Sequence, residues 1–378
     1  MSGALDRLAS GLFALALVGA PLLGLAACDG EKLDPEDGLE REDLGSFTTD
    51  TGGGADIPFE PAAGAVSALV HCGPYGYDIL ATAETITGPG DSAIYDMEDP
   101  TGTAMRVGIM SDLLPVLLPV SPDLDLAAGA HSMRMYFDAE EGVTVSCSAV
   151  YRTQPVEANP TVDIRVVFVG VNDVAPGLNA AEAETTLASV LDEVNTMWSG
   201  GNLEIGAVTY EDFDGDVATY TVVDGDEELG SLLRTVSSTN DRSITFFFVQ
   251  EITDDAGGTI LGLAGGPPGT AAVGGTSKSG VVVTAASFAS DPSEVARIMA
   301  HEGGHFLGLF HSTEKDGSES DPLSDTPECS NDADGNGTLA SNECEGTGAE
   351  NLMWWNTKDG ATMSADQGWV VSRSAAVR

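Results

Sequence analysis

One short stretch decides how the C-terminal half of the chain folds and what it can bind. It begins and ends with histidine and reads His301-Glu302-Gly303-Gly304-His305-Phe306-Leu307-Gly308-Leu309-Phe310-His311. Residues 293–307 follow Pro292 and have the pattern of a helix. Residues four apart on a helix project from one face, so His301 and His305 can bind the same zinc ion through their imidazoles.

The residues between and after these histidines complete a candidate zinc site. Glu302 can accept a proton from a zinc-bound water molecule, whose pKa the metal lowers. Gly308 can adopt a positive φ and end the helix sharply, so that the chain turns back and His311 becomes the third ligand. Three of the five histidines in the chain lie in this segment. The pattern therefore predicts a three-histidine zinc site with Glu302 as the general base.

The pattern His-Glu-x-x-His-x-x-Gly-x-x-His resembles the zinc-binding signature of the metzincin metallopeptidases. Asn351-Leu352-Met353-Trp354 is similar to the methionine-containing turn of that family. The likeness implies that Met353 supports the site from beneath the zinc without binding it. It covers residues 160–378 and implies a zinc-dependent endopeptidase that acts on protein or peptide substrates.

Two details concern the subfamily. Asp325-Thr326-Pro327 and the nearby cysteines are most similar to the pappalysin-type metzincins. Trp354 and Trp355 stand where an Asp-Tyr pair is common after the methionine, so the resemblance implies no tyrosine ligand to the zinc.

Outside the histidine segment, residues 160–378 alternate between strand and helix patterns. Apolar runs predict strands at 162–169, 203–210, 243–249 and 280–284, and amphipathic patterns predict helices at 181–198 and 227–236. We expect an α+β catalytic domain with a mixed twisted sheet beside the active-site helix. The glycine-rich residues 257–275 lack the helix that a phosphate-binding loop requires, so we expect a loop over the sheet.

Residues 59–155 have a different pattern, with short apolar runs at 65–70, 104–109 and 132–137 separated by Gly, Pro and Asp. Such spacing predicts a small β-sandwich-like domain. Prolines interrupt residues 113–120, which favours an edge strand over a helix. The region contains no group of catalytic residues, so a packing, a carbohydrate-binding and a propeptide-like role remain open.

The N-terminus has the features of an export signal. Residues 8–27 are apolar, and Leu25-Ala26-Ala27-Cys28 resembles the lipobox of bacterial lipoproteins. Cleavage would remove residues 1–27 and leave Cys28 as a lipid-modified first residue, anchoring an exported protein at the cell envelope or surface; a plain secretory signal and a membrane anchor are the alternatives. Residues 28–58 are acidic without an apolar period, which predicts a flexible tether.

The cysteine count agrees with lipidation, since five cysteines become four once Cys28 is modified. The simplest pairing gives each domain one disulfide, Cys72 with Cys147 and Cys329 with Cys344. Cys72 also superficially resembles the cysteine-switch residue that caps the zinc of some metzincin zymogens. That role would leave Cys147 unpaired, so we favour the disulfide.

A second metal signal lies between Cys329 and Cys344. The twelve residues from Asp332 to Glu343 place oxygen-bearing side chains and a central glycine at the spacing of a calcium loop. The candidate ligands are Asp332, Asp334, Asn336, Thr338 and Glu343. No amphipathic helix flanks the loop, so we expect a disulfide-clamped single calcium site, with an acidic surface turn as the alternative.

The charge balance limits the partners of the chain. With 15 Lys and Arg against 60 Asp and Glu, the formal net charge is −45, which excludes nucleic acid as a partner. This acidity fits a solvated surface and an affinity for calcium. The alternative to a peptidase is a surface binding or adhesion lipoprotein with structural zinc, but such a site needs no general base like Glu302. The sequence does not indicate an oligomeric state.

Overall fold

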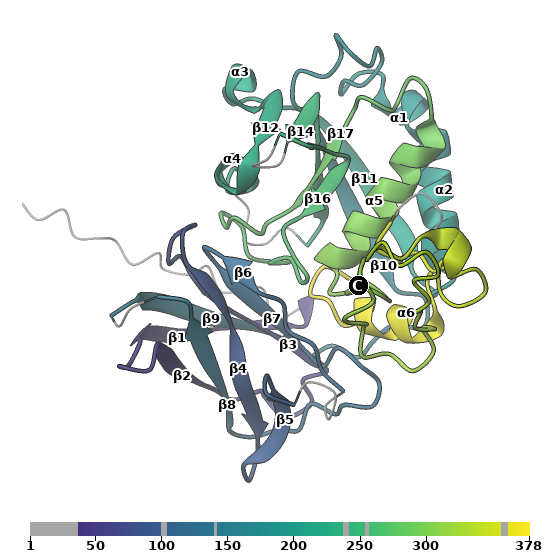
Figure 1. Cartoon of the computed structure of the whole chain (residues 1–378). Helices are drawn as coiled ribbons and strands as arrows, with labels where there is room; N and C mark the ends of the chain where they lie inside the picture. Colours follow the sequence, from purple (N-terminus) through teal and green to yellow (C-terminus); the bar gives the residue numbers. More distant parts are fainter. Residues whose placement is uncertain (1–36, 100–103, 140–141, 237–241, 254–256, 357–361) are drawn as a thin grey trace, which may run out of the picture. The chain divides into compact units, whose positions relative to one another are not determined.

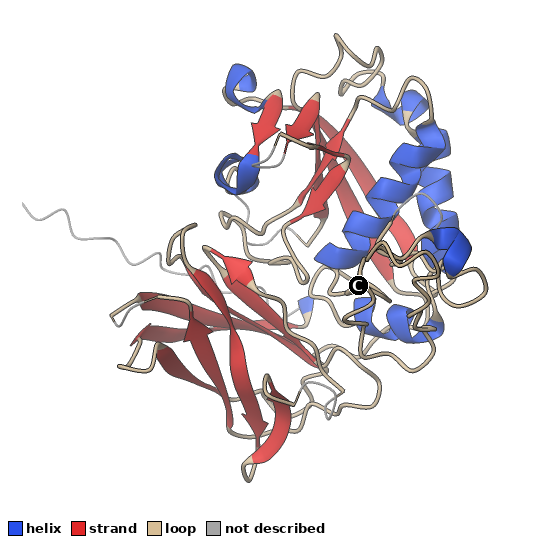
Figure 2. Cartoon of the chain, in the orientation of Figure 1, coloured by secondary structure: helices blue, strands red, loops and turns tan. Residues whose placement is uncertain are grey.

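A computed structural model of the chain describes residues 37–99, 104–139, 142–236, 242–253, 257–356 and 362–378. The expected signal segment, Cys28 and the first part of the expected tether lie outside these residues. The described part is a mixed α+β structure with several sheets and few helices (Figures 1 and 2). None of its helices is both long and apolar enough to cross a membrane.

The N-terminal half of the described chain consists of two antiparallel sheets. The first has the order β1 (Leu39–Thr48), β9 (Thr144–Arg152), β3 (Ser67–Gly73) and β7 (Leu114–Leu118). The second has the order β2 (Gly54–Phe59), β8 (His131–Phe137), β4 (Leu80–Gly88) and β5 (Ser92–Asp96), and β6 (Met110–Ser111) pairs with β4. Their buried side chains belong to the main apolar cluster, which also includes buried residues of the C-terminal half. The edge strand predicted within residues 113–120 is β7, at the end of the first sheet.

Two expectations for this half were wrong. The later part of the expected tether is structured, because residues 39–59 contain β1 and β2. The acidic β1 pairs with β9 from Leu39 to Thr48, and these backbone hydrogen bonds need no apolar period in the sequence. Residues 104–109, expected to be a strand, run irregularly into β6, although Met105 is buried.

The C-terminal half is built on a mostly parallel sheet. Its order is β11 (Glu204–Asp212), β10 (Thr161–Phe168), β13 (Ile244–Val249), β17 (Val281–Thr284) and β16 (Gly262–Ala264). Only the edge strand β16 is antiparallel to its neighbour. Every residue of β13 and β17 is buried, as expected for central strands covered on both faces. The four predicted strands correspond to β10, β11, β13 and β17.

A smaller sheet and the helices complete this half. The small sheet has the order β12 (Val222–Asp224), β14 (Glu251–Thr253) and β15 (Thr259–Ile260). The helices are α1 (Ala183–Thr186), α2 (Ala188–Ser199), α3 (Val217–Tyr220), α4 (Gly225–Leu233), α5 (Pro292–Phe306) and α6 (Ala365–Val371), with a 3-10 turn at Ser341–Glu343. The predicted helix 181–198 divides into α1 and α2. The segment 257–275, expected to be a loop, contains the short strands β15 and β16 because the sheet edges have free backbone groups to pair with.

The last residues of the chain connect its two halves. Arg152 of β9 donates hydrogen bonds to the carbonyls of Ser372 and Ser374, and the Ser67 hydroxyl of β3 donates to the carbonyl of Arg373 at 2.6 Å. Arg378 exchanges backbone hydrogen bonds with Thr161 at the start of β10. The C-terminal segment therefore lies between the sandwich and the parallel sheet and bonds to both.

Candidate metal centre

Helix α5 carries the histidine pair, and its local sequence explains both of its ends. The Asp291 carboxylate accepts a hydrogen bond from the backbone of Glu294 at 3.0 Å, and Pro292 occupies the first turn. Gly308 follows the last turn with φ +109°, which confirms the predicted sharp ending. A Cβ there would stand 2.7 Å from Leu117 Cδ2, so both the backbone angle and the space require glycine.

The two glycines between the histidines let α5 approach its neighbours closely. A Cβ on Gly303 would lie 2.7 Å from the indole of Trp198, and one on Gly304 would lie 2.7 Å from the sulfur of Met353. The same indole donates a hydrogen bond from Nε1 to the carbonyl of Ala300 at 3.1 Å. Glycine has a low helix propensity, but the chain needs it at both positions because larger residues would not fit.

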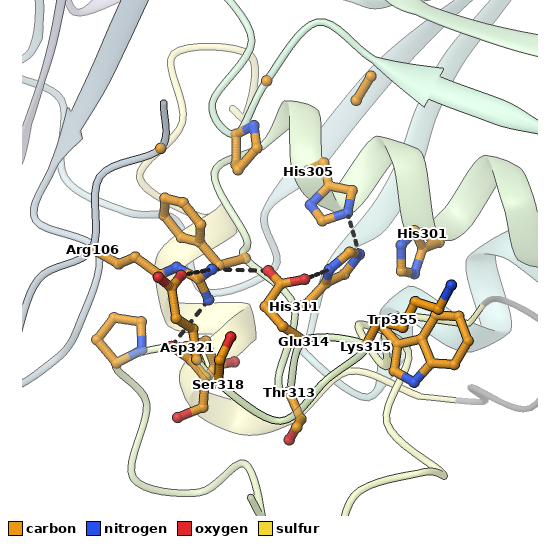
Figure 3. A pocket seen from close by; sticks show the side chains of 18 of the residues that line it. Arg106, His301, His305, His311, Thr313, Glu314, Lys315, Ser318, Asp321 and Trp355 are labelled. Atoms are coloured by element: carbon orange, nitrogen blue, oxygen red, sulfur yellow. Dashed lines mark hydrogen bonds and ion pairs between the residues drawn. The ribbon is translucent and has the colours of Figure 1, made fainter. Parts of the chain in front are cut away.

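The three histidines meet at one point beside α5. His305 Nε2 and His311 Nε2 are 3.2 Å apart, and one ring nitrogen from each of His301, His305 and His311 lies within 4.8 Å of the others (Figure 3). His301 and His305 are buried, and His311 is partly exposed. This group could hold a metal ion.

Hydrogen bonds at the other ring nitrogens fit a metal at this point. Nδ1 of His301 lies 2.8 Å from the carbonyl of Leu352, Nδ1 of His305 lies 2.7 Å from that of Leu309, and Nδ1 of His311 lies 2.8 Å from Glu314 Oε2. Because each Nδ1 faces an oxygen acceptor, we assign a proton of each ring to Nδ1. With Nδ1 as the donor, Nε2 of a neutral ring has the lone pair that can bind a cation, and the Nε2 atoms of His305 and His311 already lie 3.2 Å apart.

The pKa values of the two buried ligands agree with neutral rings. Burial, with the neighbouring His311 adding to it, lowers the pKa of His301 to about 3. Burial also lowers the pKa of His305 well below its usual range, assisted by the two neighbouring histidines. Both rings are therefore neutral near pH 7, the state in which imidazole binds metals.

Glu302 is suited to proton transfer. Its side chain lines the same cavity as the three histidines, and the residue is only 9% exposed. Burial raises the pKa of Glu302 to about 7, against the opposing effect of a hydrogen bond from the backbone of Ala264. A carboxyl group with a pKa near neutrality can both accept and return a proton.

The Met353 side chain packs against the helix that carries His301 and His305. Met353 is fully buried, and its sulfur lies beside Gly304. Gly304 lies between His301 and His305 in the sequence. The turn is held by a hydrogen bond from Met353 N to Asn351 Oδ1 at 2.8 Å and by one from Ser312 N to the Met353 carbonyl at 2.8 Å. The preceding residue, Leu352, supplies the carbonyl that accepts from His301. This turn therefore supports the helix and one of its histidines.

Sequence reasoning missed two residues that belong to the site. Glu314 contacts His311, and Arg106 Nη2 contacts Glu314 Oε1 at 2.8 Å. Burial raises the pKa of Glu314, but the hydrogen bond from His311 and the charge of Arg106 outweigh it and leave this pKa lowered. The spacing of Glu314 three residues after His311 was a usable signal. Arg106 is far away in sequence, and no pattern there points to it.

A cavity of about 1610 Å³ opens at the histidines. Its walls come from α5, the edge strand β16, the segment after His311, and residues 105–110 of the N-terminal half. Asp321 is a buried wall residue whose pKa burial raises to about 7, against hydrogen bonds from Thr326 and from the backbone of Leu323. Exposed Ile109 and Met97 add apolar surface to the wall. The cavity is therefore large enough for an extended chain.

Both predicted disulfides are present, Cys72 with Cys147 and Cys329 with Cys344. The first joins directly paired residues of β3 and β9, which excludes a zinc-capping role for Cys72. The second encloses the acidic loop, in which one oxygen from each of Asp332, Asp334 and Glu343 lies within 4.8 Å of the others.

The remaining polar groups of this loop bond to one another. Asp332 accepts from the backbone of Gly335, Asn336 and Gly337, and Glu343 accepts from the backbone of Ala333, Asp334 and Ala340. Asn336 bonds to Asp334 and accepts from the Thr338 backbone at 2.7 Å. The structure therefore brings three of the five candidate ligands together, with Asn336 and Thr338 beside them.

Comparisons with known proteins give only remote likenesses. No protein-family model and no curated protein sequence matches the chain. Among solved structures, it is similar to metalloproteinase-II from Bacteroides fragilis, at 15% identity and a TM-score of 0.31, over 61% of this chain and 62% of that one. It is also similar to a chain of a chaperone–substrate complex, at 18% identity and a TM-score of 0.29, over 56% of this chain and 33% of that one.

A third likeness is to a family two carbohydrate esterase from Cellvibrio japonicus, at 9% identity and a TM-score of 0.17, over 57% of this chain and 76% of that one. The chain thus spans about a third of the chaperone–substrate chain and 62% of the metalloproteinase. Scores this low carry no argument about fold or activity. We therefore base the functional proposal on the residues of the site.

Proposed function

We propose that the protein is a zinc-dependent endopeptidase of the metzincin type, with pappalysin-type members as its nearest kind. One observation carries the proposal: three histidines each direct a ring nitrogen to one point in a large cavity that Glu302 also lines. Three nitrogen ligands with an open fourth position are the usual set of a catalytic zinc site. A structural zinc site usually closes that position with a fourth protein ligand.

The residues of the site would have different roles in peptide hydrolysis. Zinc bound by His301, His305 and His311 would supply a Lewis acid that lowers the pKa of a water molecule and polarises a peptide carbonyl. Glu302 would accept the proton of the attacking water and pass it to the leaving amine. The carbonyls of Leu352 and Leu309 hold two of the rings in the required tautomer. Met353 would support α5 through its contact with Gly304.

The cavity supports protein or peptide substrates. It extends from the edge strand β16, whose outer side can pair with an extended peptide, to residues 105–110 of the N-terminal half. The net charge of −45 makes nucleic acid an unsuitable partner.

Separate variants of the ligands and the base test this proposal. Each histidine-to-alanine variant should lose zinc and activity together, because three protein ligands are the minimum for this site. Glu302→Ala should retain about one zinc per chain and lose cleavage by about 10²-fold to 10⁴-fold, the usual contribution of a general base. Zinc is measured by elemental analysis and cleavage with a peptide library. Glu294→Ala, on the same helix but outside the cavity wall, is the matched control.

The outcomes separate the two functions. A fully zinc-loaded Glu302→Ala variant that cleaves at the parental rate would contradict the mechanism. A parent protein that binds zinc but cleaves no peptide in a broad library would instead favour a surface binding or adhesion protein with structural zinc.

We also propose that the Asp332–Glu343 loop binds calcium. Three carboxylates are within reach of one ion, and the ligand spacing is that of a calcium loop. Calcium at about 100 times its Kd should stabilise the fold by about 2.7 kcal/mol. The double variant Asp332→Ala and Glu343→Ala should abolish the rise in Tm, whereas the exposed neighbour variant Glu345→Ala should keep it. An equal rise in all three proteins would leave only an acidic turn.

For location, we propose an exported lipoprotein anchored through Cys28, in which residues 160–378 form the peptidase domain. Two disulfides are typical of proteins in oxidising compartments. Intact-mass analysis of the protein from membranes should show a chain that begins at lipid-modified Cys28. An unmodified Cys28, or retention of residues 1–27, would contradict the anchor.

A further inference from the structure

Glu314 lies between a metal-site histidine and an arginine from the N-terminal half (Figure 3). Its Oε2 accepts from His311 Nδ1 at 2.8 Å, and its Oε1 accepts from Arg106 Nη2 at 2.8 Å. The two carboxylate oxygens thus have one partner each, and the three side chains form a continuous path from the sandwich half to the metal site.

His311 differs from the other two histidines in the kind of acceptor that orients it. The Nδ1 atoms of His301 and His305 face backbone carbonyls, which the helix end and the methionine turn hold in place. The acceptor for His311 is a glutamate side chain that is 31% exposed and has several rotatable bonds. The ring therefore has a defined orientation only if another group fixes the glutamate.

Arg106 has the contacts needed to fix the side chain of Glu314. Besides Glu314, its guanidinium donates to Glu319 Oε2 at 2.7 Å and to the carbonyl of Ser320 at 3.1 Å, and it lies over the ring of Phe310 with 5.0 Å to the centroid. Its side chain is only 17% exposed. A planar guanidinium held on several sides in this way has little freedom to turn.

The sandwich in turn holds the backbone that carries Arg106. The Gly108 carbonyl accepts from the hydroxyl of Thr82 on β4 at 3.2 Å, and β6, which follows directly, pairs with the same strand. The N-terminal half therefore fixes the position of Arg106 relative to β4.

We propose that Glu314 is a positioning residue for His311, and that Arg106 positions Glu314, so that the sandwich half completes the metal centre. The proposal rests on the zinc site proposed above. A carboxylate behind a metal-bound histidine orients the ring and raises its basicity, and its loss typically weakens metal binding by about 10-fold to 100-fold. A simple surface ion pair would instead add at most about 1 kcal/mol to stability and leave metal affinity unchanged.

Zinc affinity of the full chain, measured by competition with a chromogenic chelator, distinguishes these two roles. Glu314→Ala should raise the zinc Kd by about 10-fold to 100-fold, and Glu314→Gln, whose amide oxygen can still accept from Nδ1, by less. Arg106→Ala should raise it by about 3-fold to 10-fold, because the freed glutamate still reaches His311 part of the time. The double variant should match Glu314→Ala within about twofold, since both residues act along one path.

Two matched controls separate positioning from general effects of charge and folding. Glu211→Ala removes the carboxylate partner of Arg165 on the parallel sheet, and Arg134→Ala removes an arginine that pairs with three exposed carboxylates of the sandwich. Both should keep the parental zinc Kd within about twofold. Cobalt(II) offers a second readout, since its visible absorption should change in Glu314→Ala and Arg106→Ala but not in the controls. If Arg106→Ala unfolds, Arg106→Lys replaces it and should retain part of the affinity.

Each result bears on one claim. An unchanged zinc Kd in Glu314→Ala overturns the positioning role, and an unchanged Kd in Arg106→Ala with a loss in Glu314→Ala overturns the contribution of the sandwich half. Equal losses of zinc affinity in the two control variants would also overturn the positioning role, because they would reflect general destabilisation of the protein. If the parent and His311→Ala bind zinc equally, the proposed zinc site itself is wrong.

Discussion

The sulfur of Met353 lies so close to Gly304 that a single methyl group on the glycine would stand 2.7 Å from it. Gly304 directly precedes the second zinc-ligand candidate, His305, so the methionine turn and the helix meet where the metal site is built. The sulfur and the backbone of α5 are in direct contact, and the distance between the two elements depends on the absence of a side chain at residue 304.

Gly304→Ala should therefore destabilise the protein despite the better helix propensity of alanine. The gain in propensity is about 1 kcal/mol, whereas overpacking a buried site costs about 1–3 kcal/mol. We expect a net loss in the free energy of unfolding and weaker zinc binding, measured by denaturant titration and chelator competition. Combining it with Met353→Ala should recover part of the zinc affinity. Met353→Leu alone should cost less than about 1.5 kcal/mol.

Gly308→Ala should impair the return of the chain to His311. Alanine at a positive φ costs about 1–2 kcal/mol, and its Cβ would also meet Leu117 of β7. We expect a lower Tm and a higher zinc Kd. Adding Leu117→Ala should relieve the contact but not the backbone cost, so a complete rescue would show that φ is unimportant here.

His71 should make the sandwich sensitive to acid. Burial, with the charge of Arg41 adding to it, lowers its pKa to about 4, compared with about 6.5 in an unfolded chain. Between these values the unfolded state binds the proton more tightly, so stability should be complete above pH 6.5 and fall by roughly 3 kcal/mol as the pH drops through 4.

The free energy of unfolding, measured from pH 3.5 to 8 in the parent and in His71→Gln, checks this prediction. Subtracting the two curves removes the contributions of the other histidines. A difference curve that is flat below pH 6.5 would contradict the assignment to His71.

Replacing Cys329 and Cys344 together by serine should loosen the acidic loop. The residues are 15 positions apart, and the loss of such a loop closure costs about 3 kcal/mol by chain entropy. We expect a lower Tm and weaker calcium stabilisation, measured by calorimetry with and without calcium. The double serine variant of Cys72 and Cys147 is the comparison, since it should lower the Tm without changing the calcium response.

The sequence predicted what depends on local spacing. Helix α5, its end at Gly308 and the grouping of three histidines follow from residues within one short stretch. Strands β10, β13 and β17 were also predictable, because their buried residues form apolar runs in the sequence.

What depends on distant partners was not predictable. Strand β1 is acidic and gains its structure from pairing with β9, about a hundred residues away in sequence. Arg106 lies in a segment with the apolar pattern of a strand, yet its role depends on a glutamate from the other half of the chain. Neither partnership leaves a periodic signal in the sequence.

The hydrogen bonds from Ser67, Arg152 and Thr161 to the C-terminal segment impose an order on biosynthesis. Domains generally begin to fold as they leave the ribosome, N-terminal parts first. Here strands made early, β3, β9 and β10, cannot complete their hydrogen bonding until residues 372–378 have been made. The buried guanidinium of Arg152 must wait for the carbonyls of Ser372 and Ser374, so a chain that lacks these residues would leave the charge of Arg152 without these two acceptors.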